Sequence, residues 1–128
     1  MAQPKRILVV DDNLPLRVLL TQALEEAGYV AIAAESGEEA MAVARFDPPD
    51  LCVVDQHMPG MSGAELIRAL RGSTDDRLRS IPAIGLTGYE GAAGDLLDAG
   101  AVLSLQKPCR EATLLESVRN ALADGPKN

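Results

Sequence analysis

The sequence has few aromatic residues and no long apolar run. With no tryptophan, one phenylalanine and two tyrosines, its core must be built from Leu, Val, Ile and Ala, which suits helices packed closely on a sheet. No segment approaches the roughly 20 apolar residues needed to cross a bilayer. The apolar run at 6–10 is also too short for the core of a signal peptide. We therefore expect a cytoplasmic protein without membrane contact.

Cysteine and positive charge are also scarce. Cys52 and Cys109 are too few for a disulfide framework, and neither lies in a CxxC or CxxH spacing typical of zinc. Lys and Arg number 12 against 19 Asp and Glu, which gives a net charge of −7. Binding of a nucleic-acid backbone needs clustered cations, so we expect no direct nucleic-acid contact. The acidic excess favours a cation or a basic partner.

The 128 residues suit a single domain, which we place at 1–124, with 125–128 as a tail or the start of a linker. Short apolar runs alternate with amphipathic segments along this domain. The runs are apolar throughout, as is typical of parallel strands covered by helices on both faces. We predict strands at 6–10, 29–34, 50–55, 81–86 and 101–105.

The segments between the runs predict helices. In the first, apolar residues recur at helical spacing from Leu16 to Ala27, and Pro15 suits the first turn. Two S-x-x-E capping boxes predict the next two helix starts. Two glycines make the fourth helix short or mobile. The predicted helices are 14–27, 36–45, 62–70, 90–99 and 110–123.

This alternation predicts an α/β fold with a doubly wound parallel sheet, in which ligands bind at the carboxyl ends of the strands. Asp11 and Asp12 follow the first strand, Asp55 ends the third, Thr87 follows the fourth and Lys107 follows the fifth. Each has a local explanation, such as a helix N-cap or a turn. Local explanations give no reason for all five to meet at one edge.

Three clustered carboxylates repel one another, so they suggest a hard divalent cation: Mg²⁺, with Mn²⁺ as an alternative. One carboxylate is then free to act as a nucleophile toward a phosphoryl group. An ammonium and a hydroxyl would meet the charge on the phosphoryl oxygens, and Lys107 and Thr87 provide them.

Four motifs resemble response-regulator receiver domains of two-component signalling: DD at 11–12, DQHMPGMSG at 55–63, TG at 87–88 and KP at 107–108. The resemblance covers nearly the whole chain and implies a flavodoxin-like sheet with strand order 2-1-3-4-5. It also implies roles for individual residues. These are Asp55 as phosphoacceptor, Asp11, Asp12, Asp55 and the His57 main-chain carbonyl as metal ligands, and Thr87, Gly88 and Lys107 as phosphoryl-binding residues.

By the same resemblance, the chain takes a phosphoryl group from a sensor histidine kinase or a histidine phosphotransfer protein and turns over no separate substrate. A second copy is a further expected partner, through the face formed by 90–99, 101–105 and 110–123. Two alternatives stay open. One is a pseudo-receiver that binds partners without phosphorylation, and the other is a small aspartate-nucleophile phosphohydrolase.

The sequence departs from the family in its signalling residues. Receivers usually carry an aromatic residue three positions before the conserved lysine, where this chain has Ser104, and often Phe at the position of Cys109. Tyr89 is an alternative gate, and it also makes the chain resemble receivers attached to hybrid sensor kinases. We expect His57 and Tyr89 to restrict the hydrolytic water and so lengthen the life of a phosphoaspartate.

Overall fold

The computed structural model describes residues 3–88 and 93–124. Helices and strands alternate along this part of the chain, with one additional short helix before the fourth strand. The elements are β1 (Arg6–Val10), α1 (Leu14–Glu26), β2 (Val30–Ala34), α2 (Gly37–Phe46), β3 (Leu51–Asp55), α3 (Gly63–Arg71), α4 (Asp76–Arg79), β4 (Ala83–Thr87), α5 (Ala93–Ala99), β5 (Leu103–Gln106) and α6 (Glu111–Asp124).

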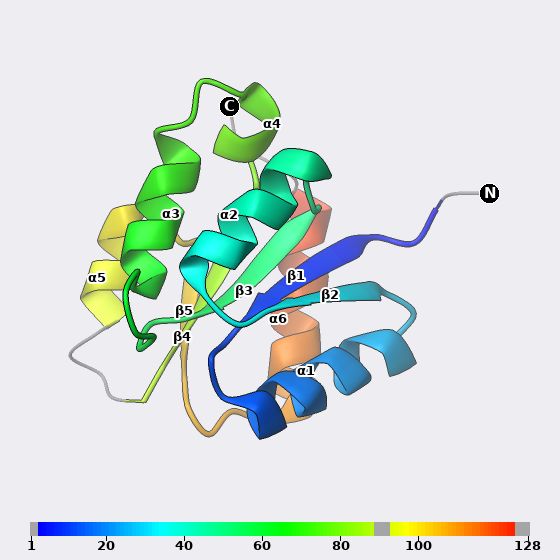
Figure 1. Ribbon diagram of the computed structural model, residues 1–128. Helices are drawn as coiled ribbons and strands as arrows, with labels where there is room; N and C mark the ends of the chain where they lie inside the picture. Colours follow the sequence, from blue (N-terminus) through cyan, green and yellow to red (C-terminus); the bar gives the residue numbers. More distant parts are fainter. Residues whose placement is uncertain (1–2, 89–92, 125–128) are drawn as a thin grey trace.

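The five strands form one parallel sheet in the order β2-β1-β3-β4-β5. Helices α1 and α6 cover one face, and α2, α3, α4 and α5 cover the other (Figure 1). Successive residues of a strand therefore pack into the two hydrophobic cores in turn, one on each face of the sheet. In β3, Leu51 and Val53 pack toward α1 and α6, whereas Cys52 and Val54 pack toward the other helices. The predicted doubly wound, flavodoxin-like fold is confirmed.

Burial separates the central strands from the edge strands. Every residue of β3 and β4 is buried, as the apolar runs predict. The edge strands differ: Val30 of β2 and Leu103 of β5 are exposed. Residues of both edge strands still pack into the cores, since Ala31 and Leu105 pack toward α1 and α6 and Ile32 packs toward the other helices.

Helix starts follow the predicted caps with one correction. Ser36 and Ser62 are the N-caps of α2 and α3, and Ser62 forms a complete capping box with Glu65. The N-cap of α1 is Asn13, whose side chain accepts a hydrogen bond from the Leu16 amide at 3.0 Å. The N-cap explanation for Asp11 and Asp12 is therefore wrong, which leaves both carboxylates for another role.

Of the predicted helix 90–99, residues 93–99 form α5, and 90–92 lie outside the described residues, as does the proposed tail at 125–128. The short helix α4 was not predicted. Its N-cap is Asp75, its Leu78 is buried, and the carbonyl of Arg79 accepts a hydrogen bond from Arg71.

Candidate functional site at the carboxyl edge of the sheet

The predicted acidic residues meet at the carboxyl ends of β1 and β3. Asp11 and Asp55 are buried, Asp12 is exposed, and each contributes a carboxylate oxygen to a cluster in which these atoms lie within 4.8 Å of one another. The parallel arrangement explains the convergence, because adjacent strand ends reach the same edge. Thr87, the last residue of β4, is also buried.

Lys107 places its ammonium against two of the carboxylates. Its Nζ lies 2.6 Å from Oδ1 of Asp55 and 3.5 Å from Oδ2 of Asp11. The main chain fixes the base of this side chain, since the Lys107 amide donates to the Thr87 carbonyl at 2.7 Å. The predicted lysine thus lies in contact with the predicted phosphoacceptor.

Three hydrogen bonds fix the position of Asp11. The Asp11 amide donates to the Ala34 carbonyl at 3.2 Å, and Oδ1 of Asp11 accepts from the Asn13 amide at 2.9 Å. Arg17 of α1 donates to the Asp11 carbonyl at 2.6 Å. The sequence reasoning did not identify Arg17, although a cation one helical turn beyond an acidic pair was a signal that could have drawn attention to it.

Burial and the neighbouring charges shift the pKa values of Asp55 and Lys107. Burial, opposed by Lys107 and reinforced by Asp11 and Asp12, raises the pKa of Asp55 above its ordinary value. Partial burial by itself would lower the pKa of Lys107, but the Asp55 and Asp11 carboxylates outweigh it and raise that pKa. The ion pair and the carboxylate repulsion therefore act on Asp55 in opposite directions.

The donor set fits a divalent cation. Of the three carboxylates in the cluster, Asp11 and Asp55 share the ammonium of Lys107 among the ion pairs of the described residues. Oδ1 of Asp55 is buried, and it lies within reach of the Lys107 ammonium. Hard oxygen ligands with excess negative charge are what Mg²⁺ prefers.

A glycine lets α3 approach this site closely. A side-chain methyl at Gly63 would lie 2.5 Å from the carbonyl oxygen of Asp55. Gly63 also donates its amide to the Gln56 carbonyl at 3.1 Å. The last residue of the DQHMPGMSG motif is therefore a packing requirement of the β3–α3 connection.

Other predicted positions lie around the acidic cluster or outside the described residues. His57 is exposed in the loop after β3, and Gly88 is exposed after β4. Tyr89 lies outside the described residues. Ser104 stands opposite Gly85 in the sheet, and its buried hydroxyl has no hydrogen-bond partner among the described residues.

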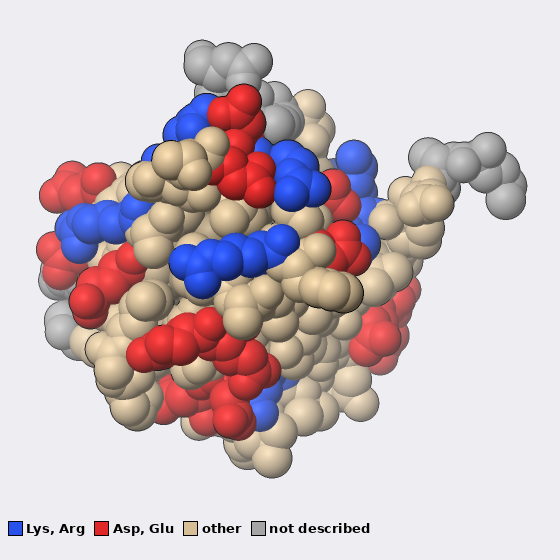
Figure 2. All heavy atoms as spheres, turned by 45° about the horizontal axis from the view of Figure 1, so that its top comes forward, with Lys and Arg blue, Asp and Glu red and all other residues tan. Residues whose placement is uncertain are grey.

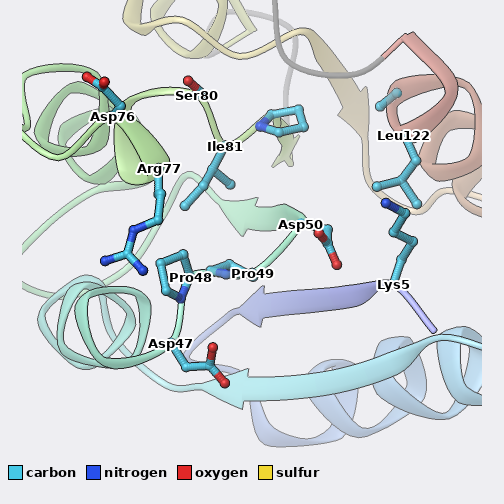
Figure 3. A pocket seen from close by; sticks show the side chains of 12 residues that line it. Lys5, Asp47, Pro48, Pro49, Asp50, Asp76, Arg77, Ser80, Ile81 and Leu122 are labelled. Atoms are coloured by element: carbon cyan, nitrogen blue, oxygen red, sulfur yellow. The ribbon is translucent and has the colours of Figure 1, made fainter. Parts of the chain in front are cut away.

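A hollow lies at the opposite, amino edge of the sheet (Figure 3). It has a volume of about 500 Å³ and lies between α4 and the end of α6. Its rim mixes Lys5 and Arg77 with Asp50 and Asp76 around proline and aliphatic side chains. The space-filling view also shows basic side chains scattered among acidic ones (Figure 2). The mixed charges of this lining favour neither a cationic nor an anionic ligand.

The fold and the acidic strand ends define a flavodoxin-like α/β protein with a polar site at its carboxyl edge. A family model described as the response regulator receiver domain matches residues 7–119. The chain therefore belongs to the response regulator receiver domains of two-component signalling. Members of this family are signalling modules that interact with histidine kinases or phosphotransfer partners.

Individual relatives support the assignment. The polar-differentiation response regulator DivK of Brucella anthropi is 32% identical over 123 residues, covering 94% of this chain and 98% of that protein. The phosphate regulon regulator PhoB of Pseudomonas aeruginosa is 38% identical, covering 92% of this chain but 52% of that protein.

A solved structure gives the same result. The receiver domain of a signal transduction histidine kinase from Syntrophus aciditrophicus has a TM-score of 0.86 and 34% identity, covering 94% of this chain and 91% of that one.

Within residues 3–88 and 93–124, no helix combines the length and apolar character needed to span a bilayer.

Proposed function

We propose that this receiver accepts a phosphoryl group on Asp55, in a Mg²⁺-dependent transfer from a phosphohistidine of a sensor histidine kinase or histidine phosphotransfer protein. One observation carries the proposal. A buried oxygen of Asp55 lies 2.6 Å from the Lys107 ammonium, within a cluster of three carboxylates. A structural ion pair alone does not need the two additional carboxylates.

In the proposed transfer, a carboxylate oxygen of Asp55 attacks phosphorus and the nitrogen–phosphorus bond of the donor breaks. The electron pair of that bond returns to the histidine ring. Lys107 and the hydroxyl of Thr87 meet the negative charge on the phosphoryl oxygens, together with the Gly88 main chain. Bound Mg²⁺ would neutralise charge between the carboxylates and the phosphoryl oxygens, held by Asp11, Asp12, Asp55 and the His57 carbonyl.

Signalling would then proceed without the usual aromatic relay, since Ser104 occupies that position. We place the protein in the cytoplasm, where the phosphodonor kinases present their catalytic domains. No separate substrate is turned over, and the acidic charge of −7 disfavours direct nucleic-acid binding. Relatives include a protein of similar length and one about twice as long, so both a stand-alone shuttle and a module of a longer regulator or hybrid kinase agree with the family.

A long-lived phosphoaspartate is a testable part of the proposal. His57 and Tyr89 would flank the phosphoryl group and restrict the attacking water. We expect His57→Asn and Tyr89→Ala to accelerate loss of the phosphoryl group, measured as the decay of phosphorylated protein after the donor is removed. Unchanged decay in both variants would refute this role.

Binding of beryllofluoride, a phosphoryl mimic, separates the receiver from a pseudo-receiver. We expect Mg²⁺-dependent amide shifts in heteronuclear NMR spectra around Asp55, Thr87 and Lys107, and their loss in Asp55→Asn. A parent protein that shows no shift would instead be a pseudo-receiver. Sustained turnover of a generic phosphatase substrate would favour the phosphohydrolase alternative.

A further inference from the structure

The residue after Asp55 is a buried polar side chain without an assigned role. Gln56 is 8% exposed, at the point where β3 leaves the sheet. A buried amide destabilises the fold unless its polar atoms find partners. The partners of Gln56 therefore indicate why a polar residue stands here.

Gln56 accepts hydrogen bonds from the first two amides of α3. Its carbonyl accepts from Gly63 at 3.1 Å, and its side-chain Oε1 accepts from Ala64 at 2.8 Å. The next amide, of Glu65, donates to Ser62 Oγ, and the Ser62 amide donates to Glu65 Oε1, each at 3.1 Å. The amides at a helix start have no partners within the helix, and here Gln56 supplies two of the four acceptors.

The same residue ties this helix start to the acidic site. The Gln56 amide donates to the Leu86 carbonyl of β4 at 2.9 Å, and Gln56 directly follows Asp55. Gly63 packs so closely on Asp55 that an added methyl would lie 2.5 Å from its carbonyl oxygen. Strand β3, strand β4 and α3 are thus joined at the residue that separates Asp55 from His57.

We infer that Gln56 is a positioning residue for the metal site, through the side-chain hydrogen bond that anchors Ala64 and fixes the main chain from Asp55 to His57. This inference rests on the proposed function, in which Asp55 and the His57 carbonyl are metal ligands. Mg²⁺ demands near-ideal octahedral geometry, so small displacements of its protein ligands weaken binding. Residues that orient ligands typically change metal affinity by about 10- to 100-fold when removed.

If the role of Gln56 were purely structural, it would act only as a cap of α3, as Ser62 does. Ser62 is therefore the matched control. Ser62 Oγ accepts the amide of Glu65, one residue beyond Ala64, at the same helix end. Ser62 is joined neither to β4 nor directly to Asp55 by the hydrogen bonds of the described residues. Loss of either cap is expected to destabilise the protein to a similar extent.

The test compares Gln56→Met, Gln56→Asn and Ser62→Ala with the parent. Methionine matches glutamine in length but lacks the amide acceptor, and asparagine keeps the amide but is too short to reach Ala64. NMR titration with Mg²⁺ alone gives the dissociation constant, urea unfolding without Mg²⁺ gives the stability, and hydrogen exchange of the Ala64 amide reports the hydrogen bond.

We expect both Gln56 variants to raise the Mg²⁺ dissociation constant about tenfold and to speed exchange at Ala64, while Ser62→Ala leaves the constant within about twofold. Affinity equal to the parent in a folded Gln56 variant, or an equal loss in Ser62→Ala, would overturn the inference and leave the proposed function intact. A parent that binds no Mg²⁺ would overturn both.

Discussion

The folded chain disfavours the negative charge on Asp55. Burial and the neighbouring Asp11 and Asp12 raise its pKa, and Lys107 only partly opposes them. Ionised Asp55 therefore opposes folding of the metal-free protein, since a raised pKa in the folded state means that the unfolded state holds the charge more readily. The residue proposed to carry the phosphoryl group thus lowers the free energy of unfolding when it is ionised.

This charge leads to a first prediction at the residue scale. Asp55→Asn should raise the free energy of unfolding in metal-free solution at neutral pH, because the neutral amide removes the disfavoured charge. The difference from the parent should shrink as pH falls through the range where Asp55 protonates, and vanish below the pKa of the unfolded chain. Urea unfolding across pH measures it.

Asp98→Asn is the control, because Asp98 is an exposed aspartate on α5 and surface substitutions usually change stability by no more than about 0.5 kcal/mol. Asp55→Asn could instead be less stable than the parent at neutral pH. The attraction of Lys107 for the Asp55 carboxylate would then outweigh its burial and its repulsion by Asp11 and Asp12, and the charge on Asp55 would stabilise the folded protein.

The sequence could predict which residues reach the site but not how each is held. Parallel strand ends share an edge, so Asp11, Asp55 and Lys107 follow from the positions of the apolar runs alone. The contact of Gln56 with Ala64 could not be predicted, because it depends on how the intervening loop returns to the start of α3. A polar residue directly after a buried strand was the available signal.

At the scale of elements, α5 packs closely on β4 because β4 has a glycine, Gly85, at the contact. Leu96 of α5 is fully buried, and a methyl added at Gly85 would lie 2.6 Å from its side chain. Ser104 stands beside Gly85 on β5, and Thr87 lies two residues further along the same face of β4. The contact between Leu96 and Gly85 therefore joins α5 to the strand that carries Thr87.

A double-mutant cycle tests this contact. Gly85→Ala should destabilise the protein by about 1–3 kcal/mol through overpacking, and Leu96→Ala by about 2–5 kcal/mol through loss of buried volume. The double variant should lose less than the sum of the two, because the smaller residue 96 leaves room for the new methyl. Urea unfolding gives all three values.

Gly94→Ala provides a control on the same helix, since nothing lies within 4 Å of a methyl added there. It should leave stability unchanged or raise it, by up to about 1 kcal/mol. Additive effects of the Gly85 and Leu96 substitutions would show that the two residues do not share the space that the structure gives them.

Elements with a repeated pattern were predictable, and those without one were not. All five strands lie within a few residues of their apolar runs, and S-x-x-E marked the starts of α2 and α3. Helix α4 has only four residues, too few for a helical period, and it depends on contacts such as the burial of Leu78. The exposure of the outer strands depends on sheet order, which apolar runs do not encode.

At the scale of the whole molecule, exposed apolar side chains lie on the α5–β5 face. Leu97, Val102 and Leu103 are 47%, 55% and 37% exposed. The homodimer expected from the family resemblance would use this face together with α6. We expect beryllofluoride with Mg²⁺ to increase the sedimentation coefficient, and Val102→Lys to reverse that change by placing a charge in the contact.

Phe46→Lys is the matched control for the dimer. Phe46 is 91% exposed at the end of α2, so the substitution removes a larger apolar side chain from another part of the surface. Dimerisation that survives Val102→Lys, or that is lost equally in Phe46→Lys, would contradict the assignment of the face.

The central claim is that Asp55 is the phosphoacceptor, and intact-mass spectrometry with acetyl phosphate tests it most directly. With Mg²⁺, the parent and the Asp50→Asn control, altered at the opposite edge of the sheet, should each gain one phosphoryl group per chain. Asp55→Asn, or the parent with Mg²⁺ chelated, should gain none. A parent that is never labelled, or labelling that persists in Asp55→Asn, would contradict the account.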